Sequence, residues 1–258
     1  MLIDTHCHLN FEAFEKDYRE VAKRCQEKGM KVITVGSQMQ NSKKAADMSH
    51  EFDFVFGAVG LHPTHINDEE FSPEEYLKLA KDNKVVAVGE TGLDYYQMWA
   101  ESKEEEARAK EGQKELLKKH LGVARQAGVP VILHCRDAYE DLIALMKEEE
   151  EIPAVVHCFL SSREIARRLL ALGFYLGFTG IITFTDDQEL FSVVKEVPLE
   201  KMFIETDAPY LAPQAYRGKR CEPIYVVEVA KKIAELKNIP VEKVVEQTGK
   251  NAEGFFKI

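Results

Sequence analysis

The amino-acid sequence predicts an α/β fold, a (β/α)8 TIM barrel with a short extra helix at its C-terminal end. Eight short segments rich in β-branched residues alternate with longer segments of helical character, which favours βαβ units and a parallel sheet. The length of 258 residues suits one such barrel, so we expect residues 1–258 to form a single domain. A doubly wound open sheet is the alternative. It usually has a glycine-rich turn after its first strand, and the segment DTHCHLN contains no glycine.

The expected strands are runs of β-branched and aromatic residues bounded by turn or helix signals. They cover Leu2–His8, Lys31–Ser37, Phe54–His62, Val85–Glu90, Val129–Arg136, Ala154–Phe159, Phe174–Gly180 and Met202–Asp207. If these strands run parallel around a barrel, all their carboxyl ends meet at one mouth.

The expected helices lie between these strands. Gly29, Gly128 and Gly173 each follow a helical stretch and precede a strand, as glycines that end helices do. The charged segment MWAESKEEEARAKEGQKELLKKHLGVARQAG is expected to form a solvated helix with ion pairs four residues apart. Residues 222–236 predict the eighth helix, and PVEKVVEQTGKNAEGFF predicts the extra one.

Composition limits the function classes. A net charge of −10 argues against a protein that coats polyanions with its whole surface, although a local basic patch is compatible with it. The N-terminal segment is polar from its fourth residue, and no run reaches the roughly 18 apolar residues that a membrane helix needs. The five cysteines lack C-x-x-C spacing, which favours reduced thiols. We therefore expect a cytoplasmic monomer without membrane association or an obligate protein partner.

Reactive side chains gather where the strands are expected to end, which is where barrel enzymes place their active sites. The group consists of His6, His8, Glu90, His134, His157, Glu205 and Asp207. A single histidine at a strand end is commonly structural, so the prediction of a metal site rests on the combination of four histidines and three carboxylates. Imidazole and carboxylate without thiolate suit Zn²⁺, Mn²⁺, Co²⁺ or Fe²⁺, with Mg²⁺ also possible. The donors exceed the needs of one catalytic ion, and two ions bridged by a carboxylate would use them all.

Three of the five cysteines directly follow a histidine, which raises the question of a mixed His/Cys metal site. Successive side chains of a strand point to opposite faces, so Asp4, His6 and His8 should share one face, and Thr5 and Cys7 the other. If the histidines face the barrel mouth, the cysteines beside them face the helix layer. The cysteines expected to pack outward in this way are Cys7, Cys135 and Cys158.

Eight motifs follow one another along essentially the whole chain. They are DTHCHL, GLHPTH, VGETGLDYY, PVILHCRDA, VVHCF, GFTGIITF, IETDAPYLAP and RGKRCEP. In these motifs the sequence resembles the TatD-family metal-dependent deoxyribonucleases, a branch of the amidohydrolase-like barrels. The resemblance implies a DNA substrate, hydrolysis of phosphodiester bonds and exonuclease activity on single strands.

The resemblance also implies roles for individual residues. The positions that match the family's metal ligands are His6, His8, Glu90, His134, His157 and Asp207. The first two would bind one metal, and the histidines of strands five and six would bind the second. Glu90 would bridge them, and Asp207 would bind a metal or act as general base, so these two are the expected catalytic residues. Two divalent ions per subunit are implied, with Mg²⁺, Mn²⁺ or Zn²⁺ as candidates.

The sequence departs from the family pattern in three places. Thr91 stands where an aliphatic residue is usual, which should be harmless. Cys221 stands where asparagine is usual, which puts any polar contact from that position in doubt. Residues 97–112 look longer and more acidic than the family norm, so the edge of the loop after strand four is uncertain.

Several residues near the expected site could contact substrate. They are His62, Tyr95, Arg136, Arg217, Lys219 and Arg220. The Arg136 guanidinium could hold a phosphate, or instead pair with Asp137 or a carboxylate at the rim. The basic loop RGKR could position phosphates, or serve only solubility. Tyr95, Tyr96 and Trp99 could stack on unpaired bases, or simply pack the rim.

Two carboxylates are expected to support the ligands rather than bind metal. Asp94 is a plausible partner for a ligating histidine, and Glu205 is expected in the same layer around the site. His50 and His120 fall in helical stretches and are expected to lie at the surface.

Two other function classes compete with the nuclease. An amidohydrolase-type enzyme could cleave amides or esters, including aminoacyl esters on tRNA, on the same barrel. Related enzymes often bridge two metals with a carboxylated lysine, and here strand four ends in Glu90 while no expected strand ends in such a lysine. A non-catalytic protein should have lost some ligands, and none is missing.

Overall fold

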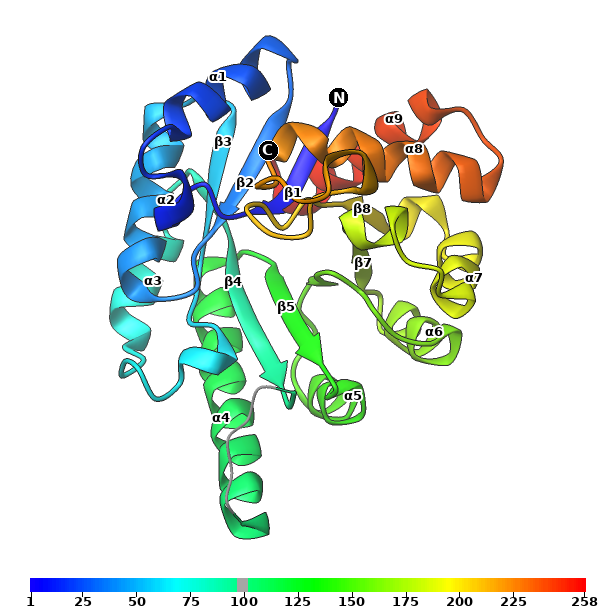
Figure 1. The fold of residues 1–258 in the computed structure, drawn as a ribbon. Coiled ribbons are helices and arrows are strands. Elements are labelled where there is room, and N and C mark those ends of the chain that lie inside the picture. Colours follow the sequence, from blue (N-terminus) through cyan, green and yellow to red (C-terminus); the bar gives the residue numbers. More distant parts are fainter. Residues whose placement is uncertain (97–101) are drawn as a thin grey trace.

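The computed structural model describes residues 1–96 and 102–258 and confirms the predicted (β/α)8 barrel. Eight parallel strands form one sheet in chain order, with helices outside it (Figure 1). The strands are β1 (Ile3–Cys7), β2 (Lys31–Val35), β3 (Val55–Val59), β4 (Val85–Asp94), β5 (Val131–Arg136), β6 (Ala154–Val156), β7 (Tyr175–Phe178) and β8 (Met202–Ile204). Strand β4 runs four residues beyond its expected end, so Asp94 belongs to the strand and pairs with Arg136 of β5.

The helices include the long charged segment, which is solvated in its first turns but buries one face from Gln113 onward. They are α1 (Tyr18–Glu27), α2 (Met39–Glu51), α3 (Pro73–Ala80), α4 (Lys103–Ala127), α5 (Tyr139–Glu148), α6 (Arg163–Ala171), α7 (Gln188–Glu196), α8 (Val226–Lys237) and α9 (Val241–Phe256). In α4, Glu106 and Lys110 pair at 2.6 Å, and the first turns project past the ends of β4 and β5 (Figure 1). No helix within the described ranges has the length and apolar character needed to cross a bilayer.

The extra C-terminal helix is present but is not short, because α9 has 16 residues. Its residues Ala252 and Phe256 belong to the apolar cluster inside the barrel, together with Ile3 and Phe203 near the starts of their strands. Gly249 lies against the Met1 carbonyl, where any Cβ would collide with it. Helix α9 therefore covers the end of the barrel opposite the strand carboxyl ends and leaves the other mouth for chemistry.

The barrel closes between its first and last strands through loop hydrogen bonds. The backbone N–H of Asp207 donates to the His6 carbonyl at 2.9 Å, and the N–H of His8 donates to the Ala208 carbonyl at 2.7 Å. Both bonds lie just beyond the end of β8, so the seam of the barrel fixes the backbone of three residues predicted to form the site.

The expected alternation along β1 is wrong at Asp4. The pairing of β1 with β2 shifts register between Asp4 and Cys7, so the strict two-residue period breaks before His6. The Asp4 carboxylate accepts hydrogen bonds from the backbone and hydroxyl of Thr206, and it lies close to the thiol of Cys25 in α1. Burial raises the pKa of Asp4 well above its usual range. Asp4 therefore ties the two edges of the barrel together on the helix side.

His120 is not at the surface, contrary to the expectation from its helical segment. Its side chain is fully buried, its Nδ1–H donates to the Leu116 carbonyl at 2.9 Å, and its Nε2 accepts the backbone N–H of Leu61 at 2.9 Å. Helix α4 turns this face toward the barrel, where Phe71 packs 4.1 Å from the imidazole. His120 is a structural link between α4 and the segment after β3.

We expect His120 to make folding stability depend on pH. Burial lowers its pKa from 6.5 to about 4, so between these values the unfolded chain binds a proton that the folded protein excludes. The stabilisation is complete above pH 6.5 and is lost as the pH falls toward 4. Between pH of about 7.5 and about 5 the loss attributable to this group is about 2 kcal/mol.

Urea unfolding of the wild type and the His120→Gln variant at both pH values measures this contribution. The variant should lose about 2 kcal/mol less than the wild type on acidification, and identical losses would contradict the assignment.

Candidate metal centre

A cavity of about 790 Å³ opens at the carboxyl ends of the strands, where the sequence places the site. The predicted metal ligands and supporting residues that line it are His8, Glu90, Asp94, His134, His157 and Asp207, and the predicted substrate contacts that line it are His62 and Arg136. His6 lies fully buried behind this surface. The structure therefore brings together residues from β1, β4 and β5 and from the segments after β6 and β8.

The first group of donors surrounds His6. Its Nε2 lies 3.3 Å from Nε2 of His8, 3.3 Å from Oε2 of Glu90 and 3.8 Å from Oδ1 of Asp207. The Val35 carbonyl can only accept, so Nδ1 of His8, at 2.8 Å, carries the hydrogen and Nε2 presents a lone pair. Two imidazole nitrogens and two carboxylate oxygens thus converge.

The second group surrounds the other oxygen of Glu90. Oε1 lies 2.9 Å from Nδ1 of His134, whose Nε2 donates to the Asp94 carboxylate at 3.0 Å. Asp94 is therefore in the supporting position that the sequence predicts, and its hydrogen bond orients the ring so that Nδ1 faces Glu90. Burial alone would lower the pKa of His134, but Asp94 and Glu90 outweigh it and raise the pKa to about 9.

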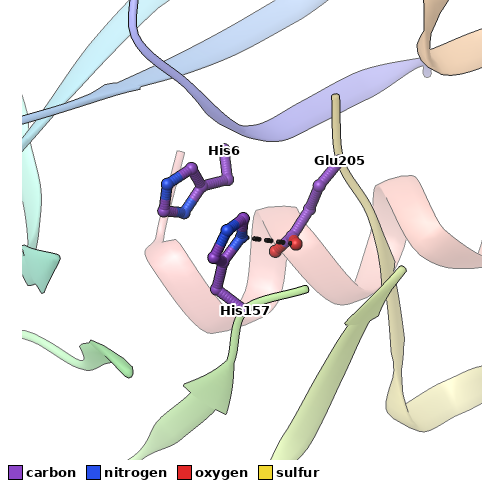
Figure 2. Close-up of side chains that lie close together, drawn as sticks. All are labelled: His6, His157 and Glu205. Atoms are coloured by element: carbon purple, nitrogen blue, oxygen red, sulfur yellow. Dashed lines mark hydrogen bonds and ion pairs between the residues drawn. The ribbon is translucent and has the colours of Figure 1, made fainter. Parts of the chain in front are cut away.

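His157 is held by Glu205, as the dashed line in Figure 2 shows. Its Nδ1 donates to Glu205 at 2.8 Å, its ring stacks on His6 at 3.5 Å, and its Nε2 lies 3.7 Å from Asp207. Burial alone would lower the pKa of His157, but Glu205 outweighs it and raises the pKa to about 10. Gly177 leaves room for this carboxylate, because a Cβ there would collide with it.

His62 lies beside the second group, in the motif GLHPTH. Its Nε2 is 3.6 Å from Oε1 of Glu90, and its ring is 4.4 Å from the His134 ring. The backbone N–H of Thr64 donates to Nδ1, which leaves the hydrogen on Nε2. Burial lowers the pKa of His62 to about 3. His62 thus presents a neutral N–H donor to the cavity, which fits a substrate contact better than a metal ligand.

The carboxylates of this centre are ionised. Burial alone would raise the pKa of Glu90, but the imidazoles of His62 and His6 lead the interactions that hold it well below its usual range. Burial would also raise the pKa of Asp207, but a hydrogen bond to His8 leads the interactions that lower it. Negatively charged oxygens and imidazole nitrogens therefore face the same small volume.

This donor set fits divalent cations. Three groups have ligand atoms within 4.8 Å of one another: His6, His8 and Glu90; His62, Glu90 and His134; and His6, His157 and Glu205. His134 and His157 do not share a group, although the resemblance assigns both to one ion. Glu90 belongs to two groups, one through each carboxylate oxygen, as a bridging ligand would.

The sequence model of the family described as TatD-related DNase matches residues 3–257. The chain belongs to this family. YabD of Bacillus subtilis, named as an uncharacterized metal-dependent hydrolase, is 40% identical over 262 residues, with 100% of both chains covered. A Klebsiella pneumoniae TatD protein named as a 3'-5' ssDNA/RNA exonuclease is 31% identical, covering 100% of this chain and 98% of its own. The crystal structure of YJJV, a TatD homologue from Escherichia coli, superposes with a TM-score of 0.87 at 28% identity, covering 100% of this chain and 98% of the other.

Of the two neighbouring tyrosines after the predicted strand four of this TatD-family chain, Tyr96 and not Tyr95 lies at the rim of the cavity. The Tyr95 hydroxyl donates to Asp141 at 2.7 Å, so its ring lies between α4 and α5 and not along the cavity. Tyr96 lines the cavity, and the Arg136 guanidinium stacks 3.7 Å above its ring. Within the described residues Arg136 has no carboxylate partner, which excludes the ion-pair alternative there. Trp99, the third aromatic considered, lies outside the described residues.

The basic loop of this TatD-family chain does not line the cavity. Arg220 pairs with Asp17 ahead of α1 and donates to the Ala13 carbonyl, because the closing loop folds back over the first helix. Arg217 stacks on Phe184 at 4.2 Å, and the Lys219 side chain is exposed. The expectation that Arg220 is free for phosphate is wrong, and Arg217 and Lys219 stand apart from the metal centre.

The expectation that three cysteines pack outward holds fully for Cys7 and is wrong for Cys158. Cys7 and Cys135 are buried in the hydrophobic cluster that packs against the helices, but Cys135 is also among the residues that line the cavity. Cys158 lies outside this cluster and lines the cavity, with its Sγ 3.3 Å from the Thr179 hydroxyl. Strand β6 ends at Val156 and Cys158 has a positive φ of 46°, so strand alternation does not reach it. Cys221, which stands where the family usually has asparagine, is fully buried and does not line the cavity.

Proposed function

We propose that this protein is a divalent-metal-dependent nuclease that hydrolyses phosphodiester bonds of single-stranded DNA, working from an end. The observation that carries the proposal is the position of Glu90, whose two oxygens face two different imidazole groups. Membership in the TatD-related DNase family supports the same reaction class. The Klebsiella relative is named as a 3'-5' exonuclease, which supports digestion in the 3' to 5' direction here.

The proposed site would hold two divalent ions, Mg²⁺, Mn²⁺ or Zn²⁺. His6 and His8 would hold one and His134 the other, with Glu90 shared between them. The family resemblance adds His157 to the second ion, although in this structure His157 groups with His6 and Glu205. Such ions supply positive charge that activates a water and offsets the charge developing on the phosphoryl oxygens. All of these residues come from one chain, which is consistent with a monomer, and the free cysteines are consistent with the cytoplasm.

Side chains of the protein would accept the proton, contact the phosphoryl oxygens and stack on a base. Asp207 is ionised and faces the cavity, so it can take the proton of the attacking water. The His62 Nε2–H and the Arg136 guanidinium can donate to phosphoryl oxygens from the β3 and β5 sides. Tyr96, beneath Arg136, can stack on an unpaired base.

The alternative is an amidohydrolase acting on amides or esters, including aminoacyl-tRNA. It is less favoured because Glu90 occupies the strand-four position and the described residues that line the cavity include no lysine. Purified protein should shorten labelled single-stranded DNA with added Mg²⁺ or Mn²⁺ and stop when EDTA is added. Inactivity on every DNA substrate, together with metal-dependent turnover of an acyl or amide library, would favour the alternative.

Replacing Arg136 with alanine should raise KM for single-stranded DNA about tenfold, because a charge-assisted contact to phosphate is lost. Arg220→Ala is the matched control, since its guanidinium is already paired with Asp17. It should leave KM within about twofold of the wild type. Steady-state kinetics on one labelled oligonucleotide compares the two, and an equal rise in both variants would contradict the assignment.

A further inference from the structure

Three large apolar side chains stand exposed around the mouth of the cavity. Tyr96, Leu160 and Tyr210 are 62%, 46% and 54% exposed, and all three line the cavity. Among the described residues, Met1 is the one other large hydrophobic side chain exposed to this degree. Apolar side chains gathered at one place on the surface mark a binding site.

The two tyrosines flank the metal centre from opposite sides. Tyr96 follows β4 and Tyr210 follows the end of β8, and strands four apart face each other across an eight-stranded barrel. Each is tied to the site, because the Tyr96 N–H donates to the Asp94 carboxylate at 3.0 Å and the Tyr210 N–H donates to the Asp207 carbonyl at 2.8 Å. The site therefore has one aromatic platform on each side of its carboxylates.

The charge of the cavity limits how much of a polyanion it can bind. Arg136 is the one lysine or arginine among the described residues that line the cavity. The carboxylates that line it are Glu90, Asp94, Asp137 and Asp207. The basic loop lies elsewhere, and the chain as a whole carries a net charge of −10. Phosphates beyond those at the metal centre and Arg136 would meet no cation here.

We propose that the cavity binds a short single-stranded end of about two nucleotides, with one base on Tyr96 and the next on Tyr210. Nucleotides further along the strand contribute little to binding. This inference rests on the proposed phosphodiesterase function. It assigns a footprint of about two nucleotides to the site, so the reaction can also consume the short fragments that nucleases cutting longer strands release.

Cleavage of labelled oligonucleotides of about 3, 6, 12 and 24 residues tests the inference, with DNA and RNA series in parallel. For the series that is cleaved, kcat/KM should change by less than about twofold between the shortest and the longest. A rise of about tenfold or more with length would overturn the inference while leaving the nuclease intact. If no series is cleaved, the nuclease proposal fails. Fluorescence anisotropy of the same oligonucleotides then decides whether affinity is independent of length.

Variants of Tyr96 and Tyr210 provide a second test of the inference. On the shortest substrate, Tyr96→Leu and Tyr210→Leu should each lower kcat/KM about tenfold, because a base loses its stacking partner. Tyr18→Leu, on α1 outside the barrel, is the matched control and should match the wild type. Thermal unfolding checks that each variant is folded. Folded platform variants with the activity of the control would overturn the inference.

Discussion

Glu90→Gln is expected to lower the rate of DNA hydrolysis by about 10³-fold or more. The substitution keeps the size of the side chain but removes the charge that faces His6 and His8 through one oxygen and His134 through the other. Both proposed ions would lose a ligand at once. Initial rates on labelled single-stranded DNA with saturating Mn²⁺ measure the effect.

The matched control for this prediction is Glu196→Gln, which neutralises a carboxylate on the outer surface between α6 and α7. It should retain the rate of the wild type. Metal content measured on the same samples separates loss of metal from loss of chemistry. If Glu90→Gln kept more than about a tenth of the wild-type rate, Glu90 would not be the bridge.

Glu205→Gln is expected to weaken metal binding by about 10- to 100-fold, although Glu205 is not expected to bind metal itself. The carboxylate fixes Nδ1–H of His157 and also accepts the backbone N–H of Cys158 at 3.0 Å. An amide can still accept one bond, but it cannot keep the imidazole as basic, so the Nε2 lone pair becomes a poorer donor.

Equilibrium dialysis against buffered Zn²⁺ or Mn²⁺, followed by elemental analysis, measures this change. Glu196→Gln again serves as the control and should bind like the wild type. Wild-type affinity in Glu205→Gln would show that the hydrogen bond to His157 does not tune the site.

The barrel and the set of strand-end residues could be predicted because both depend on local signals. Periodicity locates each strand, and a parallel barrel then brings the carboxyl ends of strands to one mouth, whatever the details of packing. This is why Glu90 and His134 meet at 2.9 Å although they are far apart in the chain. The supporting role of Asp94 was also predicted, although the expected strand ended at Glu90 and the observed strand carries Asp94 beside His134.

The errors in the prediction come from tertiary interactions that a local sequence pattern does not reveal. A register shift in β1 moved Asp4 to the helix side, and the early end of β6 freed Cys158 from strand alternation. Arg220 is paired because the closing loop meets Asp17 near the other end of the chain. His120 is buried because of what packs on α4, and the four residues that extend β4 turned Tyr95 away from the cavity.

The hydrogen bonds that join His6 and His8 to the segment after β8 also set the time at which the site can form. His6 lies in the first strand and His8 directly follows it, whereas Asp207 follows the last strand. A folding intermediate in which these two strands are not yet joined therefore holds an incomplete set of ligands, and the site is finished only when the seam closes.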